Sequence, residues 1–457
     1  MKEYSYFLTR RSNGDGFEAV SYTHLDVYKR QCWMAGGSSG LGCATVFLAK
    51  DSRMTEAGSC PEPPLRPWRR IAEWQEESMK LMHLSDLHIG KRVNEFSMLE
   101  DQKYILRQIL SIADTQGPDG VILAGDIYDK PVPPSEAVQV FDWFLTELAA
   151  REIPVFVVSG NHDSAERLAF GARLMSSRDI YLSPVYDGKV EKVCLRDEFG
   201  EVWIHLLPFL KPSTVRHVFE DEEPQTYQDA VRTALSHMEV DGMKRNVLAA
   251  HQFVTGAARC QSEEVLVGGL DNVDASLFDA FDYVALGHIH SPQSVGRKCV
   301  RYCGTPLKYS FSEEGQEKSV TMVELREKGN VSIETIPLRP LRDMRTIRGT
   351  YLEVTALSFY ENTNREDYIR AVLTDEEDIP DGLQKLRVIY PNLMGLEYDN
   401  KRTRESQSIE AAQAVEQKSE LELFEEFYEL QNNQPMSEQQ RQFARGLIEQ
   451  LAQKQEG

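Results

Sequence analysis

Two residues with metal-binding side chains follow a short apolar segment near position 80. The run 80–84 has the length of a buried strand, and Asp86 and His88 come directly after it, ahead of Gly90. Open α/β sheets place their chemistry beyond the carboxyl ends of strands, so both side chains are expected in such a crevice. Such a pair often has no metal-binding role: the Asp can simply cap a turn, and the His can be an ordinary polar residue. The pair therefore needs support from elsewhere in the chain.

Four more apolar runs end in polar residues in the same way. Residues 121–124, 154–158, 247–250 and 283–286 have the continuous apolar character of strands buried on both faces. The polar side chains at all five ends are Asp86, His88, Asp126, Asn161, His251, His288 and His290, with Asp129 and His162 beside them. Five of the ten histidines in the chain therefore fall at predicted strand ends.

The mixture of carboxylate, imidazole and amide oxygen at these ends indicates divalent metal ions. Manganese, iron or zinc suits such a set better than calcium, which takes oxygen ligands. Two ions about 3.5–4 Å apart stabilise the attacking and the leaving oxygen in phosphoryl transfer. A carboxylate between two ions must have two oxygens to share, so Asp126 is the expected bridge.

Composition bounds the class of protein. The 457 residues are enough for two or three domains, and the formal net charge of −21 makes most of the surface repel phosphate backbones. A nucleic-acid substrate would therefore need a local basic strip, bound metal or a partner. No segment approaches the length of a membrane span, and the odd count of seven cysteines favours reduced thiols and a cytoplasmic location.

Strand and helix patterns alternate from Met79 to about residue 340. We expect residues 79–340 to form one α/β domain, a two-layered β-sandwich flanked by helices, with a hairpin turn at 328–330. Helical patterns cover 105–113, 135–150 and 227–238. Residues 1–78 hold no complete βαβ unit around their glycine-rich segment. We interpret them as a non-native or unrelated extension of a protein that begins at Met79.

The chain changes character after Pro340. We expect a linker that includes 342–348, and a small α+β cap domain at 341–400 with strands at 351–354 and 386–390 and a helix at 365–373. From 401 to 457 the capping boxes Ser419-x-x-Glu422 and Ser437-x-x-Gln440 predict two short amphipathic helices. Their aromatic faces either fold back on the body or bind a partner, and we favour the partner.

The five polar strand ends resemble, in order and complete, the motifs of calcineurin-like metallophosphoesterases. The motifs are Asp86-x-His88, Gly125-Asp126-x-x-Asp129, Gly160-Asn161-His162-Asp163, His251 and Gly287-His288-x-His290. The resemblance implies two ions, the first held by Asp86, His88, Asp126 and His290 and the second by Asp126, Asn161, His251 and His288. It also implies that the His162 imidazole protonates or steadies the leaving oxygen and that Asp129 orients a histidine.

A closer resemblance is to the SbcD family, the nuclease subunits of bacterial SbcCD complexes. Segments 86–91, 94–102, 125–129 and 304–311 carry it, and it extends from Met79 to the end. It implies a DNA exonuclease and endonuclease that acts on double-strand ends and hairpins in repair, recombination and replication. It further implies manganese (Mn2+), with magnesium (Mg2+) as the alternative, a DNA-binding cap, a homodimer within a heterotetramer, and an SbcC-like coiled-coil ATPase docked on the C-terminal helices.

Two other functions stay open at this point. The metal core alone would support a phosphodiesterase or phosphatase for small substrates, although such an enzyme does not require the long C-terminal extension. A non-catalytic scaffold subunit would keep the fold for assembly, although every motif position is filled. A fold does not by itself assign a function.

Several polar residues near the motifs have ordinary structural interpretations. His83 and His205 fit core histidines with satisfied partners, and Asp163 fits a cap of the helix that follows Ser164. Lys91, Arg92 and Lys308 stand beside motifs, where phosphate contact and plain solvation are about equally expected.

Overall fold

The computed structural model describes residues 78–219, 221–258, 272–401, 403, 424–425, 428 and 436–445. The chain divides into two units, Met1–Pro61 and Glu62–Gly457, and only the second contains described residues. The predicted extension at 1–78, apart from Ser78, lies outside the described residues, as does the capping box at Ser419. None of the described helices combines the length and the apolar character needed to span a bilayer.

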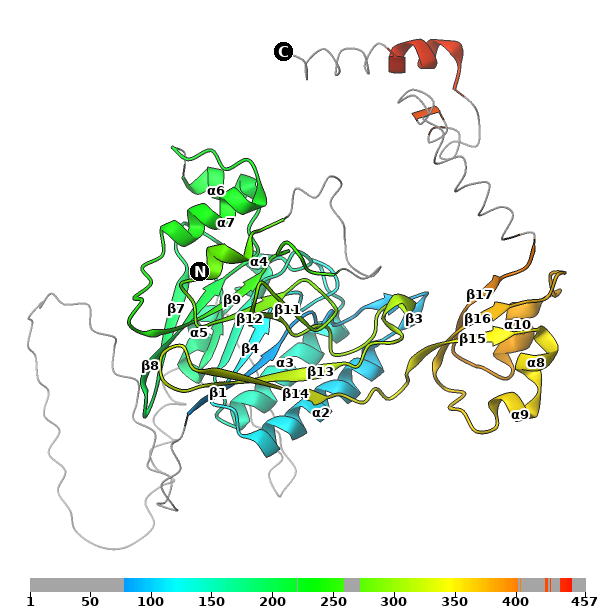
Figure 1. Ribbon diagram of the computed structural model, residues 1–457, viewed down its shortest axis with the longest axis horizontal. Helices are drawn as coiled ribbons and strands as arrows, with labels where there is room; N and C mark the ends of the chain where they lie inside the picture. Colours follow the sequence, from blue (N-terminus) through cyan, green and yellow to red (C-terminus); the bar gives the residue numbers. More distant parts are fainter. Residues whose placement is uncertain are drawn as a thin grey trace, which may run out of the picture. The chain divides into compact units, whose positions relative to one another are not determined.

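Two six-stranded sheets form the main layers of the described chain (Figure 1). The first has the order β14 (Val331–Pro337), β13 (Ser319–Leu325), β1 (Met79–Leu84), β4 (Gly120–Ala124), β5 (Val155–Val158), β6 (Ile180–Leu182). The second has the order β11 (Gln293–Val295), β12 (Arg297–Tyr302), β10 (Tyr283–Gly287), β9 (Arg245–His251), β8 (Gly200–Leu207), β7 (Glu191–Asp197). The predicted two-layered sandwich is confirmed.

Strand β1 shows how a continuous apolar run serves both faces of the first sheet. Met79 and Leu81 belong to the apolar cluster between the two sheets, whereas Met82 and Leu84 belong to the cluster on the outer face. Successive side chains of a strand point to opposite faces, so a strand covered on both sides must be apolar throughout. His83 lies on the inner face, where its Nδ1 is 2.8 Å from the hydroxyl of Tyr283.

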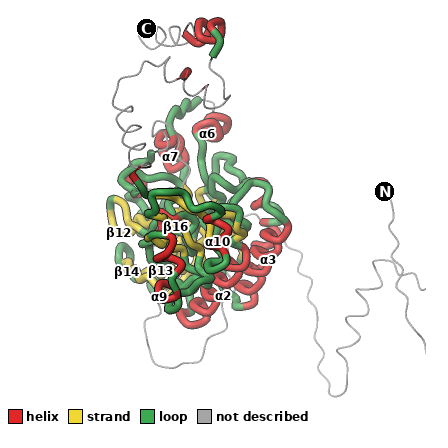
Figure 2. The backbone as a smooth tube through the Cα atoms, turned by 90° about the vertical axis from the view of Figure 1, so that its right-hand side faces the viewer, coloured by secondary structure: helices red, strands yellow, loops and turns green. Residues whose placement is uncertain are grey.

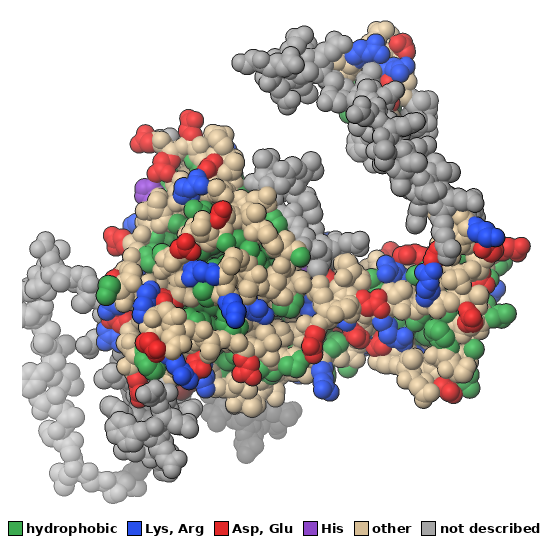
Figure 3. All heavy atoms as spheres, viewed as in Figure 1, with side chains coloured by type: hydrophobic (Ala, Val, Ile, Leu, Met, Phe, Trp, Pro, Cys, Tyr) green, Lys and Arg blue, Asp and Glu red, His purple; other side chains and the backbone are tan. Residues whose placement is uncertain are grey.

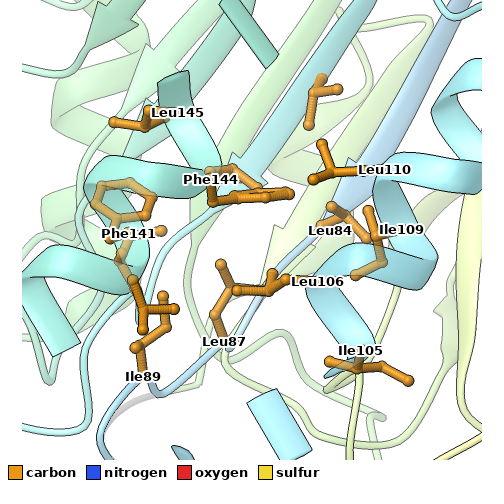
Figure 4. Packing of buried hydrophobic residues seen from close by; sticks show 14 of the residues in the cluster. Leu84, Leu87, Ile89, Ile105, Leu106, Ile109, Leu110, Phe141, Phe144 and Leu145 are labelled. Atoms are coloured by element: carbon orange, nitrogen blue, oxygen red, sulfur yellow. The ribbon is translucent and has the colours of Figure 1, made fainter. Parts of the chain in front are cut away.

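Helices cover the outer faces of the sheets (Figures 1 and 2). The first sheet packs against α2 (Leu99–Gln116) and α3 (Ser135–Ala150), and the second against α6 (Pro212–Val218) and α7 (Tyr227–Ser236). Figure 4 shows side chains of α2 and α3 meeting those of β1 and its following loop, namely Ile105, Leu106, Ile109, Leu110, Phe141, Phe144, Leu145, Leu84, Leu87 and Ile89. Each such aliphatic side chain, fully buried, contributes about 1.5–3 kcal/mol to folding.

Parallel pairing brings the predicted strand ends to common edges. Strands β1, β4, β5 and β6 run parallel in the first sheet, and β8, β9, β10 and β12 run parallel in the second. In the register of the second sheet Gly287 lies opposite His251. The loops that follow β1, β4, β5, β9 and β10 therefore leave the sandwich at its carboxyl edge.

Short elements fill the connections between these strands. They are β2 (Arg92–Val93), β3 (Phe96–Ser97), α4 (Ala165–Leu168), α5 (Ala172–Met175), η1 (Ser176–Arg178), η2 (Ala275–Phe278) and η3 (Phe311–Glu313).

The segment after Pro340 contains a third sheet with its own apolar cluster. Strands β15 (Met344–Gly349), β16 (Tyr368–Leu373) and β17 (Leu393–Tyr398) are all parallel. They are accompanied by α8 (Tyr351–Thr355), α9 (Leu357–Tyr360) and α10 (Gly382–Arg387). Helices and strands are both present, as predicted, but several were assigned to the wrong segments.

The corrections in this segment have local physical reasons. Residues 351–354 are helical because Thr350 and Glu353 form a capping box, in which each side chain accepts a hydrogen bond from the other's backbone N–H. Residues 368–373 form a strand because their alternate side chains are buried in the third sheet. The predicted linker at 342–348 overlaps β15, and the predicted strand at 386–390 begins inside α10.

The second predicted capping box is present at the C-terminal end of the described chain. The Ser437 hydroxyl accepts a hydrogen bond from the Gln440 N–H (3.4 Å), and Gln440 Oε1 accepts one from the Ser437 N–H (2.9 Å). Residues 438–445 are helical, and the Phe443 side chain there is 70% exposed.

Candidate metal centre

The loops at the carboxyl edge turn sharply because four candidate ligands have left-handed backbones. The φ angles are 52° at Asp86, 44° at His88, 50° at Asp126 and 99° at His288. Side chains with a Cβ rarely adopt this conformation, and each instance costs about 1–3 kcal/mol unless the surroundings enforce it. Neighbouring loops provide that enforcement, since the N–H groups of Asp86 and His88 donate to the carbonyls of Gly125 and Asp126.

Asp86, His88 and His290 form the first half of the cluster. The Nε2 atoms of the two histidines lie 3.2 Å apart, and a carboxylate oxygen of Asp86 is within 4.8 Å of ligand atoms of both. The Asp86 carboxylate accepts hydrogen bonds from the His288 N–H at 3.0 and 3.2 Å and from the Ser85 hydroxyl. All three residues are at most 2% exposed.

The Asp126 carboxylate lies between the two halves. Its Oδ1 accepts a hydrogen bond from the His162 N–H at 2.9 Å, which fixes the plane of the carboxylate. Its Oδ2 is 3.7 Å from His88 Nε2 and 3.4 Å from His251 Nε2. One oxygen thus faces an imidazole from each half of the cluster, so the carboxylate is placed where both halves can share it.

Asn161, His251 and His288 form the second half. The His251 Nδ1–H donates to the Ala124 carbonyl (2.9 Å), so its Nε2 faces Asn161 Oδ1 at 2.9 Å. Nδ1 of His288 lies 3.0 Å from the same oxygen. The structure therefore brings together all seven predicted ligands.

The two predicted catalytic residues lie beside the first half. The His162 Nδ1–H donates to the backbone carbonyl of Asp129 (3.1 Å), and its Nε2 is 3.9 Å from Asp126 Oδ2. The Asp129 carboxylate is 3.8 Å from His88 Nδ1, beyond hydrogen-bond range, and pairs with Lys91 at 2.7 Å. Asp129 therefore contacts a histidine through its main chain.

Burial and neighbouring charge push the pKa values of the two carboxylates apart. Burial raises the pKa of Asp86 to about 7, against the opposing charge of His251. Burial acts in the same direction on Asp126, but the nearby imidazoles of His251 and His88 outweigh it and hold its pKa well below the usual range. Asp126 is thus the carboxylate that stays ionised.

The pKa values of the histidines also shift in opposite directions. Burial lowers the pKa of His88 well below its ordinary value and also lowers that of His290. Burial lowers the pKa of His251 as well, but Asp126 overcomes this effect and raises it to about 9. Neutral imidazole is the form that binds metal, so His88 and His290 are already in that form at neutral pH.

The donor set fits divalent cations. Two buried neutral imidazoles whose Nε2 atoms face each other can place a hydrogen on only one of those atoms, whereas a cation satisfies both. His88 Nδ1 is buried without a hydrogen-bond partner, so the ring is not committed to another polar group. Imidazole, carboxylate and amide oxygen together match manganese, iron or zinc.

Asp163, beside the cluster, has a structural role that differs from the predicted helix cap. Asp163 caps no helix; its carboxylate accepts hydrogen bonds from the N–H groups of Gly160, Ile127 and Tyr128 and so joins two site loops. Ser164 is the N-cap of α4. The sequence did carry a signal for this role, because Asp163 directly follows a strand-end motif and so lies close to the neighbouring loops.

A second group missed by sequence reasoning lies behind His290. Lys318 is buried and its Nζ donates to the His290 carbonyl (2.9 Å) and to Glu313 Oε2 (2.6 Å). The other oxygen of Glu313 is 3.8 Å from His290 Nδ1. Lys308, one of the candidate phosphate contacts, instead pairs with Asp343 at 2.8 Å.

The chain matches two protein families. The calcineurin-like phosphoesterase family matches residues 79–292, and the SbcD C-terminal family, described as the type 5 capsule protein repressor C-terminal domain, matches residues 340–432. The SbcD subunit of the SbcCD nuclease from Staphylococcus epidermidis is 34% identical over 322 residues, covering 70% of this chain and 85% of that protein. The chain belongs to the SbcD family. The same subunit of Staphylococcus saprophyticus is 33% identical over 322 residues, with coverage of 70% and 84%.

Two solved structures align with part of this SbcD-family chain. A Thermus thermophilus protein is 14% identical, with a TM-score of 0.35, over 57% of this chain and all of that one. A dimetal phosphatase from Danio rerio is 12% identical, with a TM-score of 0.34, over 58% and 98%. Membership in the SbcD family rests on the sequence matches alone and makes the chain a metal-dependent phosphodiesterase.

Proposed function

We propose that the chain is the nuclease subunit of an SbcCD-like complex and hydrolyses phosphodiester bonds at DNA double-strand ends and hairpins. The position of Asp126 carries this proposal, because its Oδ2 faces an imidazole of each half-cluster. A shared carboxylate of this kind is typical of two-metal sites in nucleases and phosphatases. The names of the staphylococcal relatives select a nuclease from within that class.

We assign the ligands to two ions. Asp86, His88, Asp126 and His290 would hold the first ion, and Asp126, Asn161, His251 and His288 the second. Manganese is the expected metal because four of the seven ligands are imidazoles, and magnesium prefers oxygen; magnesium remains the alternative. The chemistry that bound divalent ions supply here is polarisation of the phosphoryl oxygens and activation of water.

His162 would act on the leaving oxygen. Its Nδ1–H is held by the Asp129 carbonyl, so its Nε2 is the nitrogen that faces the cluster. A proton on Nε2 would pass to the oxygen of the departing strand as the phosphodiester bond breaks. The Lys91 ammonium holds the Asp129 side chain away from His162, which leaves the main-chain contact to orient the ring.

Substrate and partner fit the charge and the surface of the chain. On the face shown in Figure 3, acidic and basic side chains are interspersed over the described residues, and the whole chain has a net charge of −21. Such a chain holds DNA poorly by long-range attraction, so an ATPase partner of the SbcC type would supply part of the binding. Phe424 and Phe443, 44% and 70% exposed, are candidate contacts for that partner.

A second copy of the chain would bind through the segment after the His162 loop. Phe170 and Leu174 are 82% and 79% exposed, which is unusual for two large apolar side chains so close in sequence. We propose that they meet a second copy and give a homodimer within a heterotetramer. Leu174→Asp would then halve the mass measured by light scattering, whereas Lys298→Asp, at an exposed position of β12, would not.

The domain organisation follows from the same assignment. We propose a nuclease domain at 79–340, a DNA-binding cap at 341–400 and partner-binding helices at 401–457, in a cytoplasmic complex.

The deciding experiment compares DNA with a small ester. Protein beginning at Met79 is assayed with manganese on blunt duplex DNA, hairpin DNA and a chromogenic phosphodiester, beside His162→Ala and the exposed control His217→Ala. Cleavage of DNA by wild type and His217→Ala, lost in His162→Ala, supports the proposal. If the protein cleaves only the small ester, and still does not cleave DNA after the ATPase is added, a small-substrate phosphodiesterase would replace the nuclease as the proposed function. If no substrate is cleaved, the result would favour a non-catalytic scaffold subunit.

A further inference from the structure

Gln102 is a polar residue on the apolar face of helix α2. It belongs to the segment 94–102 of the family resemblance, and the metal assignment gives it no role. It is 2% exposed and lies one turn before Ile105 and Leu106, which pack in the main apolar cluster. Burying an amide costs free energy unless it is hydrogen-bonded, so its partners explain why it is there.

All of the partners of the Gln102 side chain lie at or beside the metal cluster. Its Nε2 is 2.7 Å from the His88 carbonyl, 3.3 Å from the Leu87 carbonyl and 3.0 Å from the Tyr309 hydroxyl. Its Oε1 accepts a hydrogen bond from the Gly90 N–H at 3.0 Å. One amide thus contacts three positions of the loop that carries Asp86 and His88.

This loop needs external support on both sides. Asp86 and His88 have positive φ, so the loop does not hold its shape by local preference. Its N–H groups are held by the neighbouring loop, where those of Asp86, His88 and Ile89 donate to the carbonyls of residues 125–127. Its carbonyl groups are held from the opposite side by Gln102 and by the Tyr309 hydroxyl, which donates to the Leu87 carbonyl at 2.6 Å.

We propose that Gln102 is a positioning residue that holds His88 where it binds the first metal ion. The inference rests on the ligand set of the proposed function. His88 Nδ1 has no hydrogen-bond partner, so no hydrogen bond orients the ring from behind. The ring direction therefore depends on the backbone at His88 and on the edge-on packing of the Tyr309 ring, and Gln102 contacts both the His88 carbonyl and the Tyr309 hydroxyl. Groups that orient a metal ligand typically change metal affinity 10–100-fold when removed.

The effect should be confined to one of the two ions. Gln102 contacts the loop of Asp86 and His88, whereas His251 is held by the Ala124 carbonyl and in turn lies against Asn161, neither of which contacts Gln102. Loss of Gln102 should thus weaken the first ion and spare the second. A residue that served only the stability of α2 would weaken both or neither.

The test is a manganese titration followed by electron paramagnetic resonance, which counts bound ions without any turnover. Gln102→Leu keeps the volume of the side chain and removes its hydrogen bonds. Gln108→Leu is the matched control, because Gln108 is on the same helix and its Oε1 accepts a hydrogen bond from the Arg339 N–H (2.9 Å), at a site unrelated to the cluster. Tyr309→Phe, which removes one hydroxyl, is the milder second variant.

We expect Gln102→Leu to bind one ion with wild-type affinity and the other at least about 10-fold more weakly. Added manganese should restore its kcat on DNA, with KM for DNA unchanged. Tyr309→Phe should shift the same ion by a smaller factor, and Gln108→Leu should match wild type. Two ions bound with wild-type affinity by folded Gln102→Leu, or by Tyr309→Phe if the first variant fails to fold, would overturn the inference.

The proposed function and this inference fail in different ways. Wild type that binds two ions but cleaves no DNA even with the ATPase partner added would refute the nuclease function. The metal titration would still test the role of Gln102. Wild type that binds no manganese would overturn both. Equal weakening of both ions in Gln102→Leu would assign Gln102 a general structural role and contradict the positioning role.

Discussion

The imidazoles of His88 and His290 face each other with their Nε2 atoms 3.2 Å apart, although the two residues are 202 positions apart in the chain. Burial lowers the pKa of both rings, so neither ring readily accepts an extra proton to relieve the contact. The sandwich therefore delivers two lone-pair donors to one point from opposite sheets. That convergence, with Asp126 beside it, is the feature on which the metal assignment depends.

Asp126→Asn should abolish binding of both ions. The substituted amide can keep the hydrogen bond from the His162 N–H through Oδ1, but it removes the charge that faces His88 and His251. We expect manganese-dependent cleavage to fall by more than about 100-fold, beyond the usual effect of residues that only orient a ligand. Asp142→Asn, at an exposed position of α3, is the control. Retention of one tightly bound ion in Asp126→Asn would argue against a shared carboxylate.

Gly160→Ala should damage the site without unfolding the protein. A Cβ at this position would lie 2.1 Å from Asp126 Oδ1 and 2.4 Å from Asp126 N, and the backbone atom cannot move away by rotation of a side chain. We expect the β5 loop to shift and cleavage to fall at least about 10-fold, by analogy with other groups that orient ligands. Gly242→Ala is the matched control, because its Cβ meets nothing within 4 Å. Equal activity of the two variants, measured on hairpin DNA, would contradict the close approach.

The sheets and the ligand cluster were predictable from the sequence because burial on both faces leaves a strong signal. Runs such as Val121–Ala124 must be apolar throughout, and the polar residue that ends each run is a local exception that is easy to find. The predicted helix at 135–150 agrees with α3 to the residue. Parallel pairing then brings the ends together without further information.

The remaining features depended on contacts between distant residues. The side chain of Gln102 is explained only by carbonyls of another loop, although a polar residue on an apolar helix face was itself a signal. In the cap, Tyr368–Leu373 has a composition that suits a helix or a strand, and the third sheet decides it. The helix at Tyr351–Thr355 has a local signal in Thr350-x-x-Glu353, a capping-box pattern.

Lys318→Met should destabilise the protein strongly, and Glu313→Gln in the same chain should restore part of the loss. The two side chains are 4% and 0% exposed, and their charged atoms lie 2.6 Å apart. Removal of one partner of a buried ion pair leaves the other charge unpaired and costs about 3–5 kcal/mol of unfolding free energy. Urea unfolding at neutral pH compares wild type, Lys318→Met and the double variant. A loss below about 1 kcal/mol in Lys318→Met would show that Glu313 finds another partner.

His83 should make the protein less stable as the pH falls. Burial, followed by the nearby charge of Arg301, lowers the pKa of His83 to about 3, whereas the unfolded chain binds the proton near its ordinary value. In this pH range the unfolded state binds a proton at His83 and the folded state does not. The unfolding free energy therefore falls as the pH is lowered from about 6.5 to about 3, at roughly 1.4 kcal/mol per pH unit. Above that window the contribution is constant.

The physical reason for the His83 effect is the burial of its ring between the two sheets. Nδ1 lies 2.8 Å from the Tyr283 hydroxyl, while Nε2 is buried without a hydrogen bond, so protonation would place an unpaired N–H and a charge between the sheets. His83→Gln keeps a polar contact for Tyr283 and removes the titrating group. Between pH 8 and pH 5 the unfolding free energy of wild type should therefore fall by about 2 kcal/mol more than that of His83→Gln. His217→Gln, at an exposed position, is the control. Parallel curves for wild type and His83→Gln in chemical unfolding would mean that His83 gains its proton in the folded state.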